Sequence, residues 1–562
     1  MRTHTTSMLL LALTLAAVAC VPAPDETDPS TAIPIRAAPA APTTYYIRPD
    51  GGDYAQCTGL ADAPYPGTGT DQACAWDHPF RALPPEGPPR IASGDTLAIG
   101  LGSYQMGFGA PGADVCETDY PWDCHMPPLP GGPDPDHPTR LLGAGWDTGC
   151  TEPPELWGTE RALTVLDLTG SNHVVVACLE ITDHAGCAED HTGGLACERQ
   201  RYPYGPWADT GIYAQDAIDV TLRDLDIHGL ASAGIRAGRI ADWTVEDVRI
   251  AANGWVGWEG DIDGDDAYAG SLTFRRWTVE WNGCVETYPA EQPAGCWGQT
   301  AGGYGDGVGT GETGGHWLIE DSVFLNNASD GLDLLYTRVP GSSITIRRTV
   351  AHGNAGNQIK TNGPTHIENV LLVGDCAAFE GKPYTHHVDA CRAYGNALSV
   401  SLRPGDSATV TNATITGQGD CLAEAICEGR CTGAESVRIR NTIFRGQTDY
   451  LSPSERTCLI YHEGFAADPL DLDHNIIHHV KDDPCPVNTH DICGSPGLVD
   501  DAIDTFDPHL LAVSPAIDAG LPDSAPPDDL DGRPRVGTPD LGAYEWHEPV
   551  ARVYVPVVVL AH

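Results

Sequence analysis

Short runs of β-branched and aromatic residues recur along the middle of the chain, and most are followed by a second run that ends in Asn or Gly. The recurring runs are residues 218–222, 243–245, 272–274, 317–319, 344–346, 366–367 and 437–439. They are spaced by 21 to 29 residues, apart from two larger steps, into Trp317 and into residues 407–410, that contain cysteine-bearing insertions. Short strands at such a period predict a parallel β-solenoid in which each repeat forms one coil. A β-propeller fits less well, because its blades would be longer and antiparallel.

The period divides the chain into an all-β solenoid with a cap at either end. We expect a right-handed parallel β-helix over residues 164–446, preceded by residues 44–163 as a Pro-rich N-terminal cap with the first coils. Residues 447–498 are expected to form disulfide-rich loops and the last coils, and residues 499–562 a C-terminal module that closes the other end. The run from Ser514 to Trp546 resembles the C-terminal module of many bacterial surface β-helix proteins.

The N-terminus has the features of an export signal. Residues 8–19 are apolar, follow a basic residue and end in small residues, so residues 1–19 are predicted to be a signal peptide. Residues 17–20 (AVAC) resemble a bacterial lipobox, which predicts lipid attachment at Cys20; ordinary signal-peptidase cleavage before this cysteine is the alternative. Residues 20–43 are rich in Pro and Ala and are expected to form an extended tether. We therefore expect a secreted protein, or a cell-surface or outer-membrane lipoprotein of a bacterium.

The cysteine count fits an oxidising compartment. Without Cys20, the 19 cysteines become 18, an even number that can pair completely. Several are close in sequence, namely Cys57/Cys74, Cys116/Cys124, Cys187/Cys197, Cys284/Cys296, Cys376/Cys391 and Cys485/Cys493. Two more pairs would come from Cys421, Cys427, Cys431 and Cys458. No spacing forms a CxxC metal motif, so we interpret the cysteines as disulfides that hold long loops.

Three aspartates fall into neighbouring columns when the repeats are aligned. Residues 327–333 (NASDGLD) align with residues 354–360 (NAGNQIK) one step of 27 residues later, and residues 305–309 (GDGVG) fit one step of 24 residues earlier. Equivalent positions on neighbouring coils lie about 4.8 Å apart. One column then contains Asp306, Asp330 and Asn357, and the next contains Gly309, Asp333 and Lys360.

Carboxylates at that spacing repel one another unless a cation lies between them. Oxygen ligands at variable spacing suit Ca²⁺ better than zinc, so Asp306, Asp330 and Asp333 are predicted to bind Ca²⁺. Residues 232–236 (SAGIR) fit the same frame without a carboxylate, which makes the aspartates an addition to the scaffold. Two plainer interpretations stay open: Asp, Asn and Gly simply form turns here, or Asp333 forms a salt bridge with Lys360. A second acidic group, residues 261–266 (DIDGDD), is interpreted as a solvated turn or a structural ion site.

These motifs resemble the calcium-dependent pectate lyases of polysaccharide lyase family nine. That family has an Asp-Gly on one coil, an Asp-Asp-Gly-aromatic-Asp on the next and an Asn-Gly-Phe-Lys after that. The counterparts here are residues 306–307 (DG), 329–333 (SDGLD) and 357–360 (NQIK). Ser329 stands where the family has an acidic ligand.

The resemblance implies a Ca²⁺ ion bound by the three aspartates, a uronate-containing polysaccharide as partner, and Lys360 as the Brønsted base of a β-elimination. Asn357, Arg347, Arg348 and Arg403 are predicted to bind substrate, with Arg338 and Arg392 as further candidates. Each arginine could equally be a surface ion-pair partner. We expect a monomer that touches a membrane only through its lipid anchor.

Net charge limits the partners. The chain of 562 residues has 31 Lys and Arg against 78 Asp and Glu, a formal charge of −47. This charge excludes a general nucleic-acid binder, because phosphate recognition requires a basic surface. It also repels a polyuronate over long range, although salt screens the repulsion beyond about 10 Å.

Two other functions remain open from the sequence. A β-helix glycoside hydrolase could use Asp330 and Asp333 as acid and base. A non-catalytic surface adhesin or glycan-binding solenoid would hold Ca²⁺ for structure and stack sugars on exposed tryptophans. The candidates for such stacking are Trp243, Trp255, Trp258, Trp277, Trp281 and Trp297. The histidine pairs at residues 386–387 and 478–479 have no partners at metal-ligand spacing and are interpreted as loop residues.

Overall fold

The computed structural model describes residues 41–189, 193–198, 201–262, 264, 266–290, 293–296, 305–375, 377–382, 395–450 and 452–548. Over these ranges the chain is built from β-strands and short 3₁₀ helices, without an α-helix and without any helix long and apolar enough to cross a membrane. The 3₁₀ helices are η1 (Pro79–Arg81), η2 (Ala113–Val115), η3 (Pro121–Asp123), η4 (Gly193–Leu195), η5 (Ala377–Phe379), η6 (Ile503–Thr505) and η7 (Pro522–Ser524).

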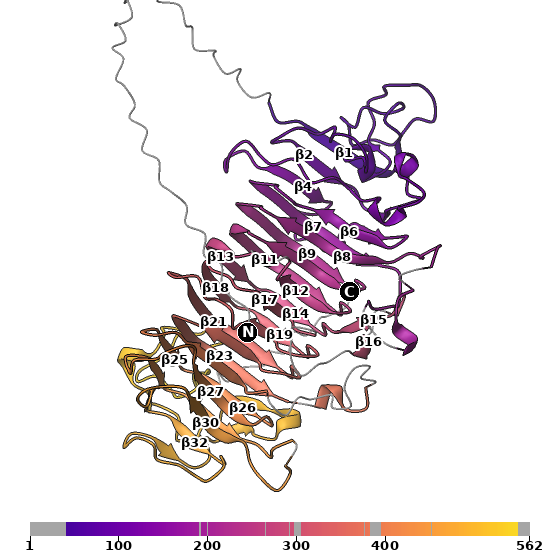
Figure 1. Cartoon of the computed structure of the whole chain (residues 1–562). Helices are drawn as coiled ribbons and strands as arrows, with labels where there is room; N and C mark the ends of the chain where they lie inside the picture. Colours follow the sequence, from indigo (N-terminus) through magenta and orange to yellow (C-terminus); the bar gives the residue numbers. More distant parts are fainter. Residues whose placement is uncertain are drawn as a thin grey trace, which may run out of the picture. The chain divides into compact units, whose positions relative to one another are not determined.

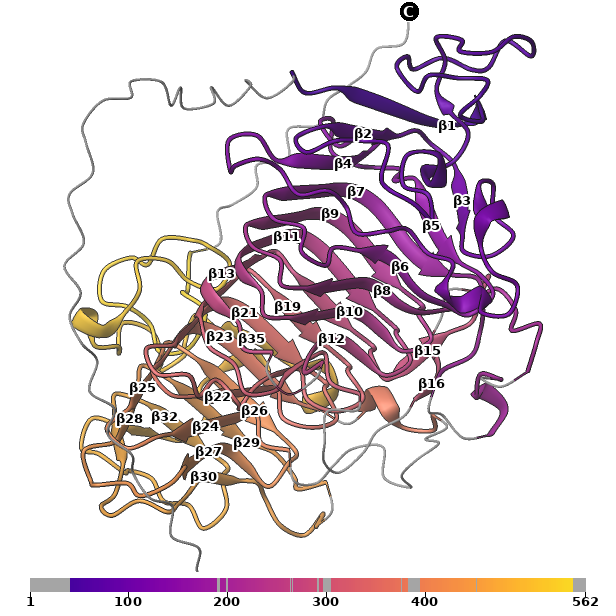
Figure 2. The same ribbon diagram turned by 45° about the horizontal axis from the view of Figure 1, so that its top comes forward.

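The strands wind into coils that each have three faces. One strand per coil joins a ten-stranded parallel sheet, which we call the first face (Figure 2). It consists of β6 (Ala162–Asp167), β8 (Ala208–Gln215), β10 (Ala233–Gly238), β12 (Val256–Gly260), β17 (Val308–Thr310), β20 (Leu332–Leu334), β22 (Ile359–Asn362), β24 (Leu398–Leu402), β27 (Cys421–Cys427) and β30 (Cys458–Glu463).

The other two faces belong to one 21-stranded sheet that bends around each coil (Figure 1). The second face contains β2 (Thr96–Ile99), β4 (Thr139–Gly143), β13 (Ala269–Arg275), β18 (His316–Glu320), β25 (Ser407–Thr411), β28 (Ser436–Arg440) and β31 (Leu470–Asp473). The third face contains β3 (Ser103–Met106), β5 (Glu155–Gly158), β14 (Thr278–Glu280), β19 (Val323–Leu325), β26 (Thr414–Gly417), β29 (Ile443–Gly446), β32 (Ile476–His478) and β33 (Ile492–Cys493). Longer strands of this sheet are β1 (Thr44–Gly52), β7 (Val174–Asp183), β9 (Val220–His228), β11 (Ala241–Ala251), β21 (Ser343–His352) and β23 (Thr365–Gly374).

Strand register confirms the predicted parallel β-helix. Leu272 pairs with Trp317, and Trp317 with Ile344, as parallel neighbours on successive coils. The large step into Trp317 and the one that pairs Thr365 with Ala408 are the two predicted insertions. Parallel pairing also extends from β1 and β2 at one end to β32 and β33 at the other, so the coils continue on both sides of residues 164–446.

Each coil turns from the second face to the third on a single residue with positive φ. These corner residues are Cys178, Asp224, Asp247, Arg276, Asp321, Arg348, Asn369, Asn412, Asn441 and His474. Asn and Asp tolerate this left-handed conformation better than other non-glycine residues, which explains their frequency in the column. The sharp corner is what lets one long strand such as β11 pair with β13 over its first half and with β14 over its second half.

Large aromatic side chains fill the middle of the solenoid. Trp243, Trp258 and Trp277 are fully buried, and Trp258 lies against Trp277 with ring centroids 5.8 Å apart. The expectation that these three tryptophans stack on sugars is wrong, because strand alternation turns them inward. Phe274 stacks on Trp317 at 5.4 Å and continues the same aromatic core.

A ladder of buried amides runs through the core beside the first face, and we call it the amide ladder. Its members are Asn253, Asn282, Asn327 and Asn354, one per coil, and Gln358, which lies on the same coil as Asn354. Each side-chain amide donates to the side-chain oxygen of the next member at 2.8–2.9 Å. Such bonds satisfy buried polar groups that would otherwise cost about 1–3 kcal/mol each.

Glycine lies beside the amide ladder on four successive coils, at Gly234, Gly257, Gly307 and Gly331. A Cβ at Gly307 would lie 2.5 Å from the Gly331 carbonyl oxygen and 2.8 Å from Nδ2 of Asn327, so no larger residue fits. The next coil has Gln358 at this position. Its side-chain oxygen accepts from Asn354 at 2.9 Å and ends the ladder.

Eight disulfides lie in the described part of the chain. Five of them join neighbours that the sequence predicts, and the four clustered cysteines pair as Cys421–Cys458 and Cys427–Cys431. The eighth, Cys150–Cys178, is an addition that links a loop to a corner residue. Cys284–Cys296 closes the antiparallel hairpin of β15 (Cys284–Glu286) and β16 (Pro293–Cys296).

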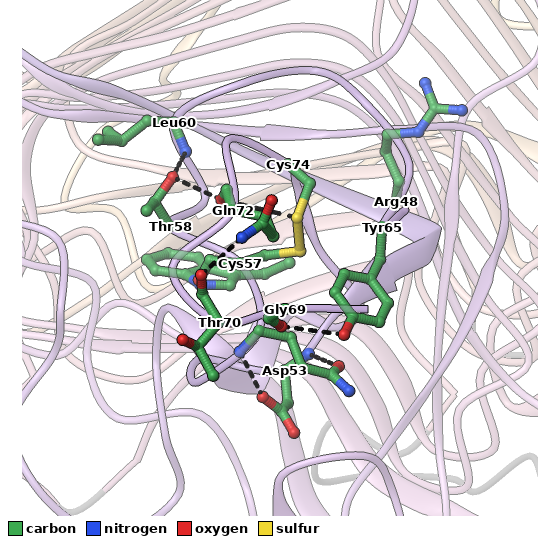
Figure 3. The surroundings of a disulfide bond; sticks show 12 residues. Arg48, Asp53, Cys57, Thr58, Leu60, Tyr65, Gly69, Thr70, Gln72 and Cys74 are labelled. Atoms are coloured by element: carbon green, nitrogen blue, oxygen red, sulfur yellow. Dashed lines mark hydrogen bonds between the residues drawn. A yellow bond between two sulfur atoms is a disulfide. The ribbon is translucent and has the colours of Figure 1, made fainter. Parts of the chain in front are cut away.

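The loop after β1 seals the N-terminal end of the core around the Cys57–Cys74 disulfide (Figure 3). Thr58 Oγ1 donates to the Gln72 carbonyl oxygen at 3.2 Å, and the Tyr65 hydroxyl donates to the Gly69 carbonyl oxygen at 3.0 Å. The disulfide and these bonds give a loop with no regular strand a fixed shape over the first coil.

The C-terminal segment packs against the corner column of the later coils, beside them in Figure 2. Asn369 donates to the carbonyl oxygen of Asp528 at 2.7 Å, and Asn412 to that of Asp540 at 2.9 Å. The segment contains a short antiparallel pair, β34 (Leu498–Asp500) and β35 (Asp507–Leu510). These contacts run along the side of the coils, whereas the sequence predicted that residues 499–562 close their end.

Several sequence predictions fall outside the described residues. They are the signal peptide, the lipidation site Cys20, most of the tether, the Cys376/Cys391 pair, Asp263, Asp265, Trp297, Arg392, the histidines at 386–387 and the residues after 548.

Candidate functional site

The two predicted columns form at the start of three first-face strands. Gly309 of β17 pairs with Asp333 of β20, which pairs with Lys360 of β22, in the register that the repeat alignment gives. Asp306 and Asp330 immediately precede β17 and β20. Here the chain enters the first face from the turn that holds the amide ladder, so the site shares its coils with that ladder.

Asp306 and Asp330 begin a chain of side-chain bonds to successive coils, which we call the acid column. Asp306 Oδ1 accepts from the backbone N–H of Asp330 at 2.9 Å, and Asp330 Oδ1 accepts from that of Asn357 at 2.5 Å. Asn357 and Asn396 continue the pattern to the next two coils, at 2.8 and 3.1 Å. One oxygen per residue makes these bonds, and asparagine makes them as well as aspartate does. The negative charges are therefore not required for stacking the coils.

Lys360 lies among the carboxylates. Its Nζ is 2.5 Å from Asp330 Oδ2 and 3.0 Å from Asp333 Oδ2. Asp306, Asp330 and Asp333 are all buried, and each offers an oxygen within 4.8 Å of the other two. The salt bridge between Asp333 and Lys360 that the sequence left open is thus present, but it is one part of a four-residue cluster.

The cluster holds more negative than positive charge. Burial, together with the charges of Asp330 and Asp333, raises the pKa of Asp306 to about 7. Burial also raises the pKa of Asp333. Burial lowers the pKa of Lys360, but the three carboxylates outweigh this effect and raise its pKa above the ordinary lysine value. Three acids around one ammonium group form a site that is suited to a further cation.

The donor set fits Ca²⁺. Ca²⁺ takes oxygen ligands at about 2.3–2.6 Å, so ligands on opposite sides of the ion lie up to about 5 Å apart. The oxygen separations within 4.8 Å meet this limit. Ser329 has no carboxylate, and three protein carboxylates are fewer ligands than Ca²⁺ prefers. Positions would therefore stay open for water or a substrate carboxylate.

Glu259 extends the column on the far side of Gly309, which the sequence interpretation missed. β12 pairs with β17 so that Glu259 is opposite Gly309, and the glycine leaves space between this glutamate and Asp333. Burial raises the pKa of Glu259 to about 8, to which the charge of Asp306 adds. The signal was present in residues 257–259, which repeat residues 234–236 one coil later.

The predicted substrate-binding arginines do not gather at this site. Arg347 and Arg348 lie on β21, on the second face and its corner, where both bond Glu320. Arg403 follows β24 and pairs with Asp406 at 2.8 Å. Asn357 does lie in the acid column, where its side chain bonds Asp330 at 2.9 Å. Each coil passes from one face to the next within a few residues, so a basic residue near the motif in sequence need not lie on the same face.

A different arginine lies on the first face in line with the acids. Arg236 of β10 pairs in register with Glu259, one coil away. Its guanidinium carbon lies 4.9 Å from the ring centre of Trp255 and its nearest acidic contact is Asp209 at 3.7 Å. On the other side of Lys360, a hollow of about 540 Å³ is lined by Asn396, Glu424, Tyr461 and neighbouring residues of the last coils. The acids therefore lie in the middle of a polar track along the first face.

The second acidic group forms a turn in its described part. Asp266 accepts from the backbone N–H groups of Ile262 at 2.6 Å and Gly264 at 3.1 Å. Asp261 donates its own backbone N–H to Glu259 at 2.8 Å. These bonds agree with the interpretation as a turn.

No protein-family model and no curated protein matches the chain. Solved structures with a similar fold include the pectate lyase Pel9A, with a TM-score of 0.41 and 13% identity, covering 90% of this chain and 97% of the other. An alginate lyase from Paenibacillus sp. str. FPU-7 has a TM-score of 0.34 and 13% identity, with coverages of 67% and 93%. A rhamnogalacturonan lyase has a TM-score of 0.30 and 11% identity, covering 77% of this chain and 87% of the other. At these TM-scores the fold assignment rests on the strand pairing, and the chemistry on the residues of the site.

Proposed function

We propose that the protein is a Ca²⁺-dependent polysaccharide lyase that cleaves a uronate-containing glycan by β-elimination, with Lys360 as the base. The observation that supports it most is the surplus charge of the site, where three buried carboxylates share one ammonium group. If the column only joined coils, amides would be sufficient, as they are at Asn357 and Asn396, and no carboxylate would be needed. The motif resemblance to the family-nine pectate lyases supports the same residue roles.

The chemistry follows from the position of Lys360. The base removes the proton on the carbon next to the uronate carboxyl group, the bond to the glycosidic oxygen breaks, and a carbon–carbon double bond forms while the leaving oxygen takes up a proton. Bound Ca²⁺ would supply charge neutralisation of the uronate carboxylate. Lys360 can accept a proton only in its neutral form. Once the charges of Asp330 and Asp333 are engaged by a cation, burial lowers the pKa of Lys360 with less opposition.

Arg236 is the better candidate to bind a second uronate carboxylate. It lies on the first face with Lys360, and Trp255 beside it offers a ring on which a sugar can stack. Arg347 and Arg348 form ion pairs with Glu320 on another side of the coil. A glycan that runs along the solenoid axis would place one sugar over the acids and others over Arg236 and the hollow near Glu424.

The test is ultraviolet absorbance during incubation with a panel of polyuronates, in Ca²⁺ or in chelator. Elimination creates an absorbing double bond, whereas hydrolysis creates reducing ends without that absorbance. We expect Ca²⁺-dependent absorbance from the wild type and a loss of about 10²–10⁴-fold in Lys360→Ala, the range of general-base catalysis. Arg438→Ala is the control for loss of a cation, because Arg438 is exposed on the second face, where it pairs with Asp471 at 3.1 Å.

Other outcomes would favour the alternatives. Reducing ends without absorbance, lost in Asp330→Asn, would indicate a glycoside hydrolase. Glycan binding without any product would indicate an adhesin in which Ca²⁺ is structural.

The eight disulfides in the described residues are typical of a protein that folds in an oxidising compartment outside the cytoplasm. We further propose that the chain is anchored by a lipid at Cys20. Metabolic labelling with a fatty acid tests this, with Cys20→Ala as the variant that should lose the label.

A further inference from the structure

A second group of metal-ligand side chains lies at the C-terminal end of the solenoid, away from the acid column. Asp473 is the last residue of β31, and His474 is the corner residue that follows it, with φ of 55°. His490 comes from the loop before β33, which the Cys485–Cys493 disulfide closes. Pairing of Ile476 with Ile492 holds the corner and the loop side by side.

The three side chains converge on one point. Asp473 Oδ1 lies 2.8 Å from Nδ1 of His490 and 3.2 Å from Nδ1 of His474. Each residue offers a ligand atom within 4.8 Å of the other two. Ligand atoms around a tetrahedral Zn²⁺, with bonds of 2.0–2.1 Å, lie about 3.3 Å apart. Two of the three separations are already close to this value.

The imidazole of His474 supplies an independent observation. Its Nδ1 is buried, and its 3.2 Å contact with Asp473 Oδ1 does not have good hydrogen-bond geometry. A buried polar atom without a partner costs about 1–3 kcal/mol. Preceding coils have Asn412 and Asn441 at the same corner, and both amides are hydrogen-bonded. A metal ion would give the His474 nitrogen a well-aligned partner, which the contact with Asp473 does not.

The loop is built to present His490. Asp491 accepts from the backbone N–H of Asn475 at 3.0 Å and from that of Asn488 at 2.7 Å, so its two oxygens hold the loop to the last coil. His490 itself is largely exposed and can adjust toward an ion. This arrangement leaves the fourth position of a tetrahedral site open to water.

We propose that Asp473, His474 and His490 form a site for Zn²⁺ or a similar first-row divalent ion, which fastens the disulfide-closed loop to the end of the solenoid. Two imidazoles and one carboxylate suit Zn²⁺, whereas the oxygen-only acid column suits Ca²⁺. The site does not depend on the proposed lyase activity. The site is not evident from the sequence, because His474 and His490 are 16 positions apart and meet only through strand pairing.

Calorimetric titration of the full chain with Zn²⁺, in saturating Ca²⁺ to occupy the acid column, tests the proposal. We expect one Zn²⁺ per chain and a higher unfolding temperature. His490→Gln should weaken binding at least about tenfold, a change of 1.4 kcal/mol. Because His490 lies on an exposed loop, this variant should fold normally. His474→Asn should weaken binding by at least as much. This variant introduces the residue type found at the corners of the three preceding coils, so it should fold normally.

The controls separate the two metal sites. His316→Gln, on the second face, and Asp330→Asn, in the acid column, should leave Zn²⁺ binding unchanged. Co²⁺ should show the visible absorption of a tetrahedral site in the wild type and lose it in His490→Gln. The proposal is overturned if the wild type binds no Zn²⁺ at micromolar concentrations, or if both histidine variants bind it as tightly as the wild type.

Discussion

Two columns of side chains cross the same coils and join them in similar ways, but they differ in charge. The amide ladder passes one hydrogen bond from coil to coil inside the core, from Asn253 to Asn354, and ends at Gln358 of the same coil as Asn354. The acid column does the same at the start of the first face, from Asp306 through Asp330 to Asn357 and Asn396. The first uses amides throughout, whereas the second begins with two carboxylates.

This difference in charge distinguishes the hydrogen bonds that the fold requires from the carboxylates that it does not. Where the acid column reaches Asn357 and Asn396, amides make the same backbone contacts, so carboxylates at Asp306 and Asp330 are not a requirement of stacking. Burying them costs free energy, which appears as the raised pKa of Asp306. A costly charge that the scaffold does not need is a mark of a functional site.

The Asp330→Asn variant is the strongest test of whether the charge of the acid column is functional or structural. The variant keeps the bond to the next coil, as Asn357 does, and Lys360 keeps Asp333 as a partner, so the free energy of unfolding in chelator should change by less than about 1 kcal/mol. Loss of a metal ligand should lower the Ca²⁺-dependent rate by about 10²–10⁴-fold, or roughly 3–5 kcal/mol of transition-state stabilisation. Chemical denaturation and lyase assays measure the two effects. A large loss of stability would show that the charge is structural.

Asn327→Ala should lower stability and leave activity nearly unchanged, the opposite of the effects expected for Asp330→Asn. The variant removes the bonds of Asn327 to Asn282 and Asn354 and leaves buried donors without partners, which should lower the free energy of unfolding by about 2–3 kcal/mol. Activity per folded molecule should stay close to that of the wild type. Urea denaturation followed by fluorescence of the buried tryptophans measures the change. Loss of catalysis without loss of stability would contradict the assignment of this ladder to the scaffold.

The sequence predicts the fold and the acid triad for the same reason. Both depend on the period of the coils. Asp306 lies on one coil, Asp330 and Asp333 on the next and Lys360 on the third, without a long insertion between their motifs. Glu259 escaped notice because 50 residues separate it from Gly309, its partner in register, and such an insertion hides the period. Distance along the chain therefore limits how much of a column can be aligned.

The direction in which a side chain points was harder to predict than the coil on which it lies. Arg347 lies on β21, the next strand after Asp333 in sequence, but on another side of the coil. Trp258 follows Trp255 by three residues yet points into the core. The outcome for each depends on where a coil bends, and the bends depend on single residues such as Arg348 with positive φ. Nothing in the local composition marks an arginine as a corner residue, so these assignments required the structure.

Protonation offers a third test of the acid column, with a smaller effect. The pKa of Asp306 is raised to about 7, and a proton on this carboxyl competes with Ca²⁺. Affinity for Ca²⁺ should therefore rise about tenfold between pH 6 and pH 8, as the ionised fraction grows. In chelator the sign reverses for stability: native Asp306 holds a proton that the unfolded chain releases, so stability falls as pH rises from about 4 to 7. Calorimetry at several pH values checks both, with Asp306→Asn as the control that should reduce the dependence.

The smallest expected effect concerns charges outside both columns. Arg347 bonds Glu320 at 2.7 Å on the second face, where Arg275 bonds the same carboxylate at 3.0 Å. Arg347→Ala should thus lower the free energy of unfolding by no more than about 1 kcal/mol, because Glu320 keeps other partners. The KM for a polyuronate should change less than about twofold, whereas Arg236→Ala, on the first face, should raise it by tenfold or more, the equivalent of about 1.4 kcal/mol. Steady-state kinetics of the two variants compares one arginine in line with the acids and one on another face. If Arg347→Ala raised KM as much as Arg236→Ala, the substrate track would not follow the first face, and charge would matter on the second face as well.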